Sequence, residues 1–336
     1  MGPTGMKLSL ILALGACATA SAQQRPSPIA EAELVKRLAT TVDSLTKISE
    51  FSGVVLLAKD GAPLFEKAYG FADREAKRPN NIETAFNIGS INKLFTSIAI
   101  RQLAAQGKLD LDSTLAKYWP DYPNADVARR VTIRQILNHR SGIGGDIFAA
   151  PPGKTRHAVR HNRDYLQLFV DQPLNFEPGT RQQYSNAGYV LLGMLIERLS
   201  GMDYYRYVQQ HIYDLAGMIR TGHWPVDSLP PNTAIGYTRR EGDLVRNAPF
   251  LPGRGSAAGG GYTTAHDLMR LTVALRQRKI PNAPPYAAIA GGAGGLNGVL
   301  EGDLPGGYDL IVLANLDPPA AERVSRIVRG WLGSDD

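Results

Sequence analysis

The hydrophobic pattern is clearest near the two ends of the chain. Within residues 30–46, apolar side chains recur every three or four positions, at Leu34, Leu38, Val42 and Leu45. This spacing places them on one face of an α-helix. A similar pattern over residues 320–332 predicts a second helix that closes the chain.

Segments with the character of β-strands lie beside both of these helices. Two apolar runs, residues 51–58 and 63–70, flank a Lys-Asp-Gly turn at residues 59–61, which is typical of a β-hairpin. Strand-like sequence returns only at residues 287–300 and 308–315. We therefore expect an α+β fold, in which one antiparallel sheet is built from both termini and flanked by helices.

The middle of the chain has the spacing of helices. Apolar residues three and four positions apart predict helices over residues 94–106, 131–137, 189–199 and 204–215. Clusters of Gly and Pro separate these segments. We expect an all-helical lobe, roughly residues 95–270, inserted into one domain of residues 30–336. The active-site cleft would then lie between the lobe and the sheet.

The start of the chain predicts export. Lys7 precedes a short apolar run, residues 8–14, and the small residues at 20–22 follow. This order is typical of a secretory signal peptide, and the apolar run is too short to span a bilayer. We expect cleavage after Ala22, a linker over residues 23–29, and a secreted or periplasmic protein.

The only cysteine leaves a second possibility open. Residues 14–17, Leu-Gly-Ala-Cys, resemble a bacterial lipoprotein box. Cys17 would then be lipidated and would anchor the protein to a membrane. On either interpretation a single cysteine cannot form an internal disulfide.

Composition and charge limit the classes of function that the chain can have. The chain has 336 residues, of which 43% are hydrophobic, enough for one large domain. Its formal net charge is +6, and the basic residues are scattered, although Arg156, Arg160 and Arg163 fall close together. A nucleic-acid-binding protein normally concentrates its charge on one element. We therefore expect no nucleic-acid partner.

A Ser-x-x-Lys pair marks the first candidate chemistry. Ser90 and Lys93 stand three residues apart at the opening of a predicted helix, which places both on one face. A serine hydroxyl needs a base to become a nucleophile, and a lysine with a lowered pKa can be that base. Taken alone, the same pair also fits a helix cap followed by a solvated lysine.

A second cluster supports the chemical interpretation. Tyr184 and Asn186 flank Ser185, so in an extended segment their side chains point the same way. A phenol can relay a proton, and an amide can hydrogen-bond a lysine and a substrate carbonyl. The stretch also fits a turn before a helix, because Ser-Asn is a common N-cap environment.

Several motifs together resemble the serine β-lactamase and penicillin-binding-protein superfamily, closest to its class C β-lactamase and esterase-like branch. The resemblance extends over nearly the whole mature chain. Its pieces, in order, are FNIGSINK (86–93), ILNHRSGI (136–143), FEPG (176–179) leading into YSN (184–186), and GGGYTTAHDL (259–268).

The resemblance implies a role for each of these residues. Ser90 would attack an acyl carbon and form an acyl-enzyme, with Lys93 as base. Tyr184 would relay the proton and also serve deacylation, while Asn186 would orient the acyl side chain and Lys93. His139 would be a structural residue that shapes a turn below the cleft.

The family's third motif is altered in this chain. The resemblance implies a Lys or His, a small residue and a Gly on a strand beside the cleft, and here the cationic position is Ile289. Gly291 and Gly292 keep the small positions and would contact the substrate. The backbone amides of Ser90 and Gly292 would form an oxyanion hole. The missing cation weakens any contact with a substrate carboxylate.

Other chemistries fit less well. His157 and His161 are four residues apart, but the metalloprotease motif also needs a glutamate between them, and we expect no metal site. Ser90 lacks the glycine two positions later that a nucleophile elbow requires. Residues 259–261 are glycines but precede no phosphate-binding lysine, so we expect no P-loop and no cofactor.

These observations predict a serine hydrolase that acts through an ester at Ser90. Its substrates would be small esters, amides or D-amino-acid peptides, in some cases derived from peptidoglycan. Without a cation at position 289, we rank neutral esters first, D-peptides second and β-lactams third. The alternative is a weak or inactive relative that binds peptidoglycan fragments or a partner protein.

Overall fold

The computed structural model of the protein describes residues 29–334. The expected signal peptide (1–22), the lipidation position Cys17 and residues 23–28 of the linker lie outside the described residues. The α-helices of the described part are α1 (Glu31–Lys47), α2 (Asn92–Ala105), α3 (Leu115–Tyr118), α4 (Ala125–Arg130), α5 (Ile133–Leu137), α6 (Asn186–Ser200), α7 (Tyr204–Val208), α8 (Asp214–Ala216), α9 (Ala265–Arg276) and α10 (Ala320–Leu332).

The strands fall into one larger sheet and three short pairs. The larger sheet contains β1 (Gly53–Lys59), β2 (Ala62–Tyr69), β9 (Ala288–Ala293), β10 (Leu296–Leu304) and β11 (Tyr308–Ala314). The short strands are β3 (Phe71–Asp73), β4 (Arg78–Pro79), β5 (Phe86–Asn87), β6 (Tyr237–Arg240), β7 (Asp243–Arg246) and β8 (Tyr262–Thr263).

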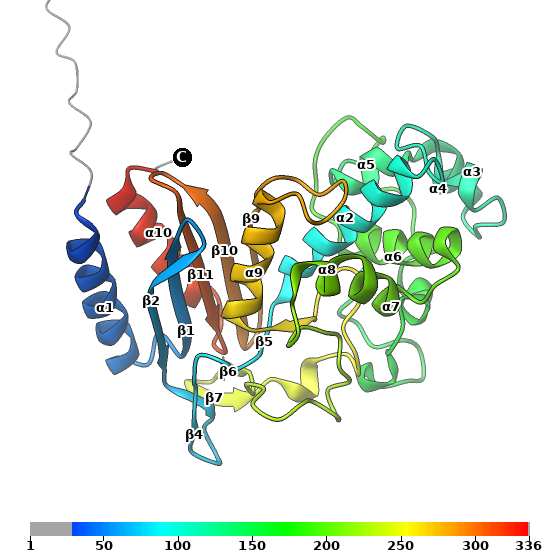
Figure 1. Cartoon of the computed structure of the whole chain (residues 1–336). Helices are drawn as coiled ribbons and strands as arrows, with labels where there is room; N and C mark the ends of the chain where they lie inside the picture. Colours follow the sequence, from blue (N-terminus) through cyan, green and yellow to red (C-terminus); the bar gives the residue numbers. More distant parts are fainter. Residues whose placement is uncertain (1–28, 335–336) are drawn as a thin grey trace, which may run out of the picture.

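The sheet joins the two ends of the chain, as the sequence predicts. Its order is β2-β1-β11-β10-β9 with antiparallel neighbours, and β1 pairs with β11 from Gly53↔Ala314 to Lys59↔Tyr308. Asp60 and Gly61 both have positive φ, which suits the tight turn between β1 and β2. β9 lies at the edge of the sheet, where its outer side faces the helical part of the molecule (Figure 1).

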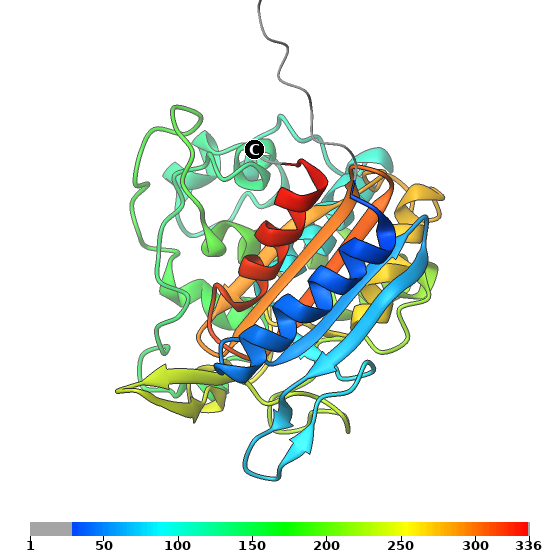
Figure 2. The same ribbon diagram turned by 90° about the vertical axis from the view of Figure 1, so that its left-hand side faces the viewer.

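The terminal helices cover one face of this sheet. α1 and α10 lie side by side across it (Figure 2). Alternate residues of β1 explain the layering, because Val55 and Leu57 pack with α1 and α10 while Val54 and Leu56 belong to the opposite core. The sheet is therefore buried on both faces.

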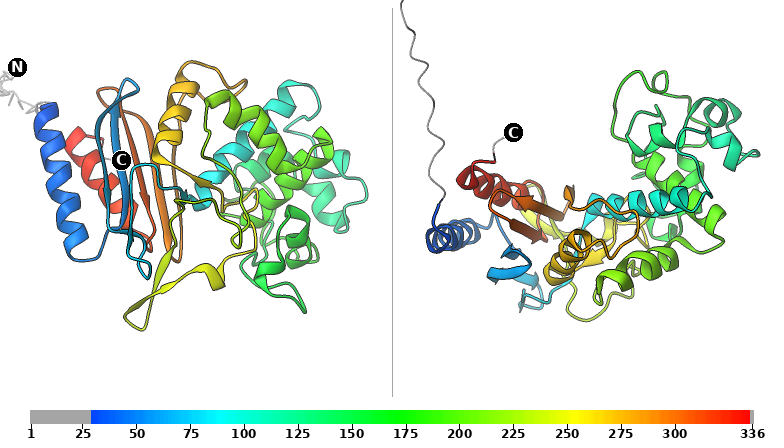
Figure 3. Two further views of the ribbon diagram at one scale, coloured as in Figure 1. Left: turned by 60° about the horizontal axis from the view of Figure 1, so that its bottom comes forward. Right: turned by 45° about the horizontal axis from the view of Figure 1, so that its top comes forward.

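The other helices lie beyond the second face. α9 packs directly against β1 and β11, and α2 leads away from the sheet to pack against α6 and α7 (Figures 1 and 3). The start of α2 is thus held between the sheet edge and the helical region. Among residues 29–334, no helix has the length and apolar character needed to cross a membrane.

The segment expected to be all-helical also contains strands. β6 and β7 form a hairpin around Glu241 and Gly242, which both have positive φ, and β5 pairs with β8. The prediction that strands return only near the end is therefore wrong. β6 and β7 are short and mostly polar, so they lack the alternating apolar residues that indicate a buried strand.

Candidate active site

Ser90 lies on a tight turn that leads into α2. It belongs to the 3₁₀ turn η1 (Gly89–Ile91), which continues as α2 from Asn92. Gly89 has φ of 49°, and its amide donates to Asn87 Oδ1 at 3.0 Å. The turn therefore presents the Ser90 hydroxyl beside the first turn of a helix, as the Ser-x-x-Lys spacing predicts.

Lys93 is buried beneath Ser90 and is fully hydrogen-bonded. Its Nζ donates to Ser90 Oγ at 3.1 Å, to Asn186 Oδ1 at 2.8 Å and to the carbonyl of Ala258. The side chain is only 4% exposed. Burial lowers the pKa of Lys93 to about 7. Lys93 is therefore a lysine that can lose its proton near neutral pH, and not the solvated lysine of the alternative interpretation.

Tyr184 and Asn186 approach Ser90 and Lys93 from the start of α6. The Tyr184 hydroxyl lies 2.6 Å from Ser90 Oγ. Between the two residues, Ser185 caps α6, because its Oγ accepts from the amide of Gly188 at 3.0 Å. The N-cap interpretation is therefore confirmed, and the cap also directs the two flanking side chains toward Ser90 and Lys93. The structure brings Ser90, Lys93, Tyr184 and Asn186 into one hydrogen-bonded group.

His139 supports this group from behind. Its Nδ1 accepts the Ser185 amide at 3.1 Å, and its ring packs 4.6 Å from that of Tyr184. Burial and the charge of Lys93 lower the pKa of His139 to about 4. His139 is therefore neutral near pH 7 and positions Tyr184, which agrees with the structural role expected for it.

The two glycines of β9 occupy different environments. Gly291 is buried, and a Cβ there would lie 2.3 Å from the Ile88 carbonyl oxygen and 2.6 Å from the Ser90 amide nitrogen. Gly292 instead lines the cavity beside Ser90, together with Gly89. The resemblance implies that both glycines contact the substrate. The structure instead places Gly291 against the backbone of η1, and only Gly292 of the two lines the cavity.

Ile289 lies on the same side of β9 as Gly291. Its partly buried side chain packs against the core that includes Ile88 and Ile91. The resemblance implies a cation at position 289. The side chain there is apolar, so this position adds no charge to the cleft.

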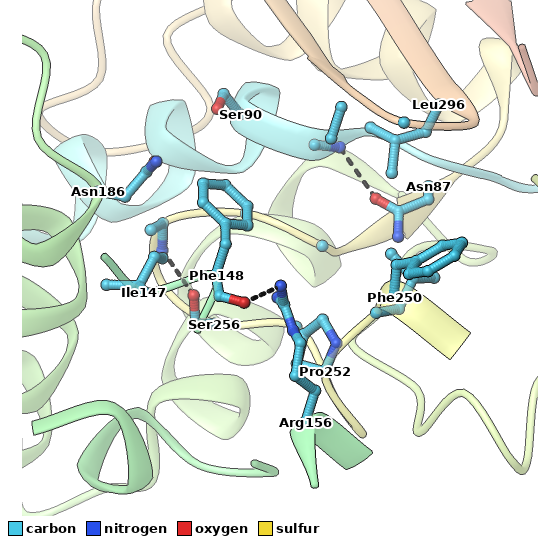
Figure 4. A pocket seen from close by; sticks show the side chains of 18 of the residues that line it. Asn87, Ser90, Ile147, Phe148, Arg156, Asn186, Phe250, Pro252, Ser256 and Leu296 are labelled. Atoms are coloured by element: carbon cyan, nitrogen blue, oxygen red, sulfur yellow. Dashed lines mark hydrogen bonds between the residues drawn. The ribbon is translucent and has the colours of Figure 1, made fainter. Parts of the chain in front are cut away.

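A cavity of about 230 Å³ opens beside Ser90 (Figure 4). Ser90 and Asn186 line it together with Gly292, Gly255, Ser256, Ala258, Gly259 and Gly260. Its apolar lining residues are Ile147, Phe148, Val226, Phe250, Leu251, Pro252 and Leu296. Arg156 and Arg240 also line it. Gly259 and Gly260 of the glycine run thus contribute to the cavity wall.

Sequence reasoning missed most of this lining. Phe148, Arg156 and Phe250 come from coil or 3₁₀ segments far apart in the chain, and no periodic pattern connects them. The only signal was the grouping of Arg156 with Arg160 and Arg163. His157 and His161 do not line the cavity. Residues 29–334 contain no cluster of three or more His, Cys, Asp or Glu side chains that could hold a metal ion.

Comparison with known proteins identifies relatives of this chain. The Beta-lactamase family model matches residues 38–313. Esterase EstB of Burkholderia gladioli is 30% identical over 280 residues, covering 73% of this chain and 71% of EstB. The mitochondrial serine beta-lactamase-like protein LACTB of Homo sapiens is 26% identical over 322 residues, covering 75% of this chain and 59% of LACTB.

A solved structure extends the similarity to the whole fold. The crystal structure of a penicillin-binding protein from Bacillus halodurans is similar with a TM-score of 0.76 and 30% identity, covering 86% of this chain and 99% of that one. The chain spans between 41% and 62% of the length of four curated relatives, LACTB among them. The chain belongs to the beta-lactamase family of serine hydrolases, whose members include proteins named as penicillin-binding proteins and esterases.

Proposed function

We propose that the protein is a serine hydrolase that acts through an acyl-enzyme at Ser90. The observation that carries this proposal is the position of Ser90 Oγ, 3.1 Å from Lys93 Nζ and 2.6 Å from the Tyr184 hydroxyl. Such a group is the arrangement expected of an activated nucleophile, whose base is itself oriented by a third residue.

Lys93 is the general base in this proposal. A neutral amine has two N–H donors and one lone pair, while Lys93 has three acceptors around it. When the proton is lost, the two remaining donors are satisfied by Asn186 Oδ1 and the Ala258 carbonyl. The lone pair is then directed at the Ser90 hydroxyl. The fixed acceptors therefore orient the base before substrate arrives.

Tyr184 relays protons at the other side of Ser90. Burial raises the pKa of Tyr184 and outweighs the lowering effect of its hydrogen bond with Ser90. The phenol is therefore protonated near pH 7 and can donate to the leaving group. The same hydroxyl is placed to orient the water that attacks the acyl-enzyme in the second step.

The backbone of η1 and β9 supplies the oxyanion hole. Ser90 and Gly292 both line the cavity, and the missing side chain at Gly291 lets β9 pass directly against the Ser90 amide. Amide donors fixed at this point stabilise the negative charge that develops on the carbonyl oxygen.

The absence of a cation at position 289 supports a ranking of substrates. Ile289 gives no cation beside β9, so a carboxylate next to the scissile bond gains no ion pair there. Esters that are neutral around the scissile bond therefore rank first, D-amino-acid peptides second and β-lactams third. A penicillin turned over faster than a matched ester would overturn this order.

Hydrolysis of p-nitrophenyl acetate and butyrate tests the proposal. We expect turnover by the protein and a loss of about 1000-fold or more in Ser90→Ala. Ser44→Ala, at an exposed position of α1, is the matched control and should keep full activity. Equal, near-background rates for the protein and Ser90→Ala would contradict the proposed hydrolase activity. They would favour the alternative of a binding protein without turnover.

A further inference from the structure

The cavity beside Ser90 is positively charged. Arg156 and Arg240 line it, and its described lining residues include no Asp or Glu. The rest of the lining is apolar or neutral. Because Ile289 leaves the edge of the sheet uncharged, the positive charge of this cleft comes from two other segments, η2 (Arg156–Ala158) and the end of β6.

Arg156 is the more deeply placed of the two. Its side chain is half-buried among the lining residues, away from Ser90 (Figure 4). One nitrogen, Nη1, donates to the carbonyl of Phe148, and the guanidinium lies 5.5 Å from the centre of the Phe148 ring. These contacts hold the side chain in place and leave most of its five N–H donors free for another group.

Arg156 has no ion-pair partner within the described chain. No carboxylate of residues 29–334 forms an ion pair with it, although Asp146 and Tyr165 act on it through space. Burial outweighs both effects and lowers the pKa of Arg156. A guanidinium nevertheless stays protonated. A half-buried cation without a counter-ion costs free energy, which is expected where a ligand supplies the counter-ion.

Arg240 stands at the rim of the same cavity. It is exposed, and its guanidinium lies 5.0 Å from the centre of the Phe250 ring. Like Arg156, it has no ion-pair partner among the described residues. It therefore adds positive charge near the entrance without closing the cavity.

We propose that the cavity binds an acyl chain with a carboxylate at its far end, and that Arg156 is the specificity-determining contact for that carboxylate. The preferred substrates would be half-esters of dicarboxylic acids, which are neutral around the scissile bond and anionic at a distance from it. This inference rests on the proposed function, because it names the substrate class of the same site. Arg240 attracts the same group at the entrance.

Paired substrates test the inference. The p-nitrophenyl half-esters of succinate, glutarate and adipate are compared with p-nitrophenyl butyrate, valerate and hexanoate. We expect a lower KM for at least one half-ester than for its neutral match. Arg156→Gln should raise that KM by about 10-fold to 100-fold, the value of a charge-assisted hydrogen bond. The KM for the neutral esters should change by less than about twofold.

Matched variants separate a direct contact from a general effect of charge. Arg163→Gln removes the same charge from an exposed residue that does not line the cavity, and should leave every KM unchanged. Arg156→Lys keeps a cation and should recover part of the preference. It also remains informative if Arg156→Gln fails to fold. Arg240→Gln should reduce the preference less than Arg156→Gln.

Binding to Ser90→Ala distinguishes failure of this inference from failure of the proposed function. Calorimetry should show tighter binding of p-nitrophenyl hydrogen glutarate than of p-nitrophenyl valerate, lost in the double variant with Arg156→Gln. If binding follows this pattern but no ester is turned over, the proposed function fails and the anion site stands. Equal binding of both esters, a preference for a cationic acyl group, or equal effects of Arg156→Gln and Arg163→Gln would overturn the inference.

Discussion

At the scale of single residues, the environment of Lys93 determines how this site can work. The lysine is buried without a carboxylate partner, and its neighbour His139 is neutral near pH 7. Desolvation is therefore the cause of its lowered pKa. The rings of Tyr184 and Tyr189, with centres 4.8 Å and 5.5 Å from Nζ, favour the charged form, but desolvation outweighs them.

The activity should follow the deprotonation of Lys93. A base works in its deprotonated form, so kcat/KM for p-nitrophenyl butyrate should rise as the pH increases through about 7 and level off above it. Lys93→Met keeps an unbranched side chain that is one atom shorter and has no base, and should lower kcat/KM by about 100-fold to 10,000-fold. Lys36→Arg, exposed on α1, serves as the control. A flat profile between about pH 6 and 8 would contradict the role of Lys93 as base.

Among the structural elements, the contact between β9 and η1 holds Ser90 against the edge of the sheet. It depends on a position without a side chain, because the backbone of η1 fills the place of a Cβ at Gly291. The register of β9 with β10, where Gly291 pairs with Gly298, holds the strand in this position. The geometry of Ser90 is therefore coupled to the edge of the sheet.

Gly291→Ala should damage both stability and activity. The added methyl would overlap the Ile88 carbonyl and the Ser90 amide, so η1 and β9 must separate. We expect a loss of about 1–3 kcal/mol in the free energy of unfolding, measured by urea denaturation, and at least a tenfold drop in kcat. Ala290→Ser changes an exposed neighbour on the same strand and should be nearly neutral. Normal activity in Gly291→Ala would show that this close approach is not required.

His266 connects three elements on a surface away from the cavity. From α9, its Nε2 contacts Glu66 of β2 at 2.8 Å and its Nδ1 contacts Glu83, in the loop before β5, at 2.5 Å. Burial alone would lower the pKa of His266, but the hydrogen bonds to Glu66 and Glu83 outweigh it and raise the pKa above 6.5. The folded state therefore binds this proton more tightly than the unfolded state.

This raised pKa predicts a pH-dependent contribution to stability. The contribution is fully present below about pH 6.5 and is lost as the pH rises through the folded-state pKa. His266→Gln should lower the free energy of unfolding by about 0.5–1 kcal/mol near pH 6 and by much less near pH 9. His157→Gln is the control for the loss of a surface histidine. An equal loss at both pH values would mean that the ion pairs contribute nothing.

At the scale of the whole molecule, the site forms where distant parts of the chain meet. The sheet contributes Gly292, η1 and α2 contribute Ser90 and Lys93, and the start of α6 contributes Tyr184 and Asn186. No single one of these elements carries all the residues of the site. The packing of η1 against β9 and of α2 against α6 therefore brings these residues together.

The sequence predicts the parts of this arrangement that depend on local spacing. Ser90 and Lys93 share a helical face, Tyr184 and Asn186 alternate around a cap, and the terminal helices and hairpin follow their apolar patterns. The sequence analysis did not predict the β6–β7 hairpin or the wall of the cavity. Phe148, Arg156 and Phe250 meet only through tertiary packing of irregular segments, which leaves no periodic trace in the sequence.

Trapping the ester tests whether an acyl-enzyme forms at Ser90. The protein is mixed with p-nitrophenyl butyrate, quenched in acid within the first turnover, and examined by intact and peptide mass spectrometry. We expect a butyryl group on the peptide that contains Ser90, absent from Ser90→Ala and retained in Ser44→Ala. Ester hydrolysis without any butyryl adduct at Ser90, or with the adduct on another residue, would contradict the proposed acyl-enzyme.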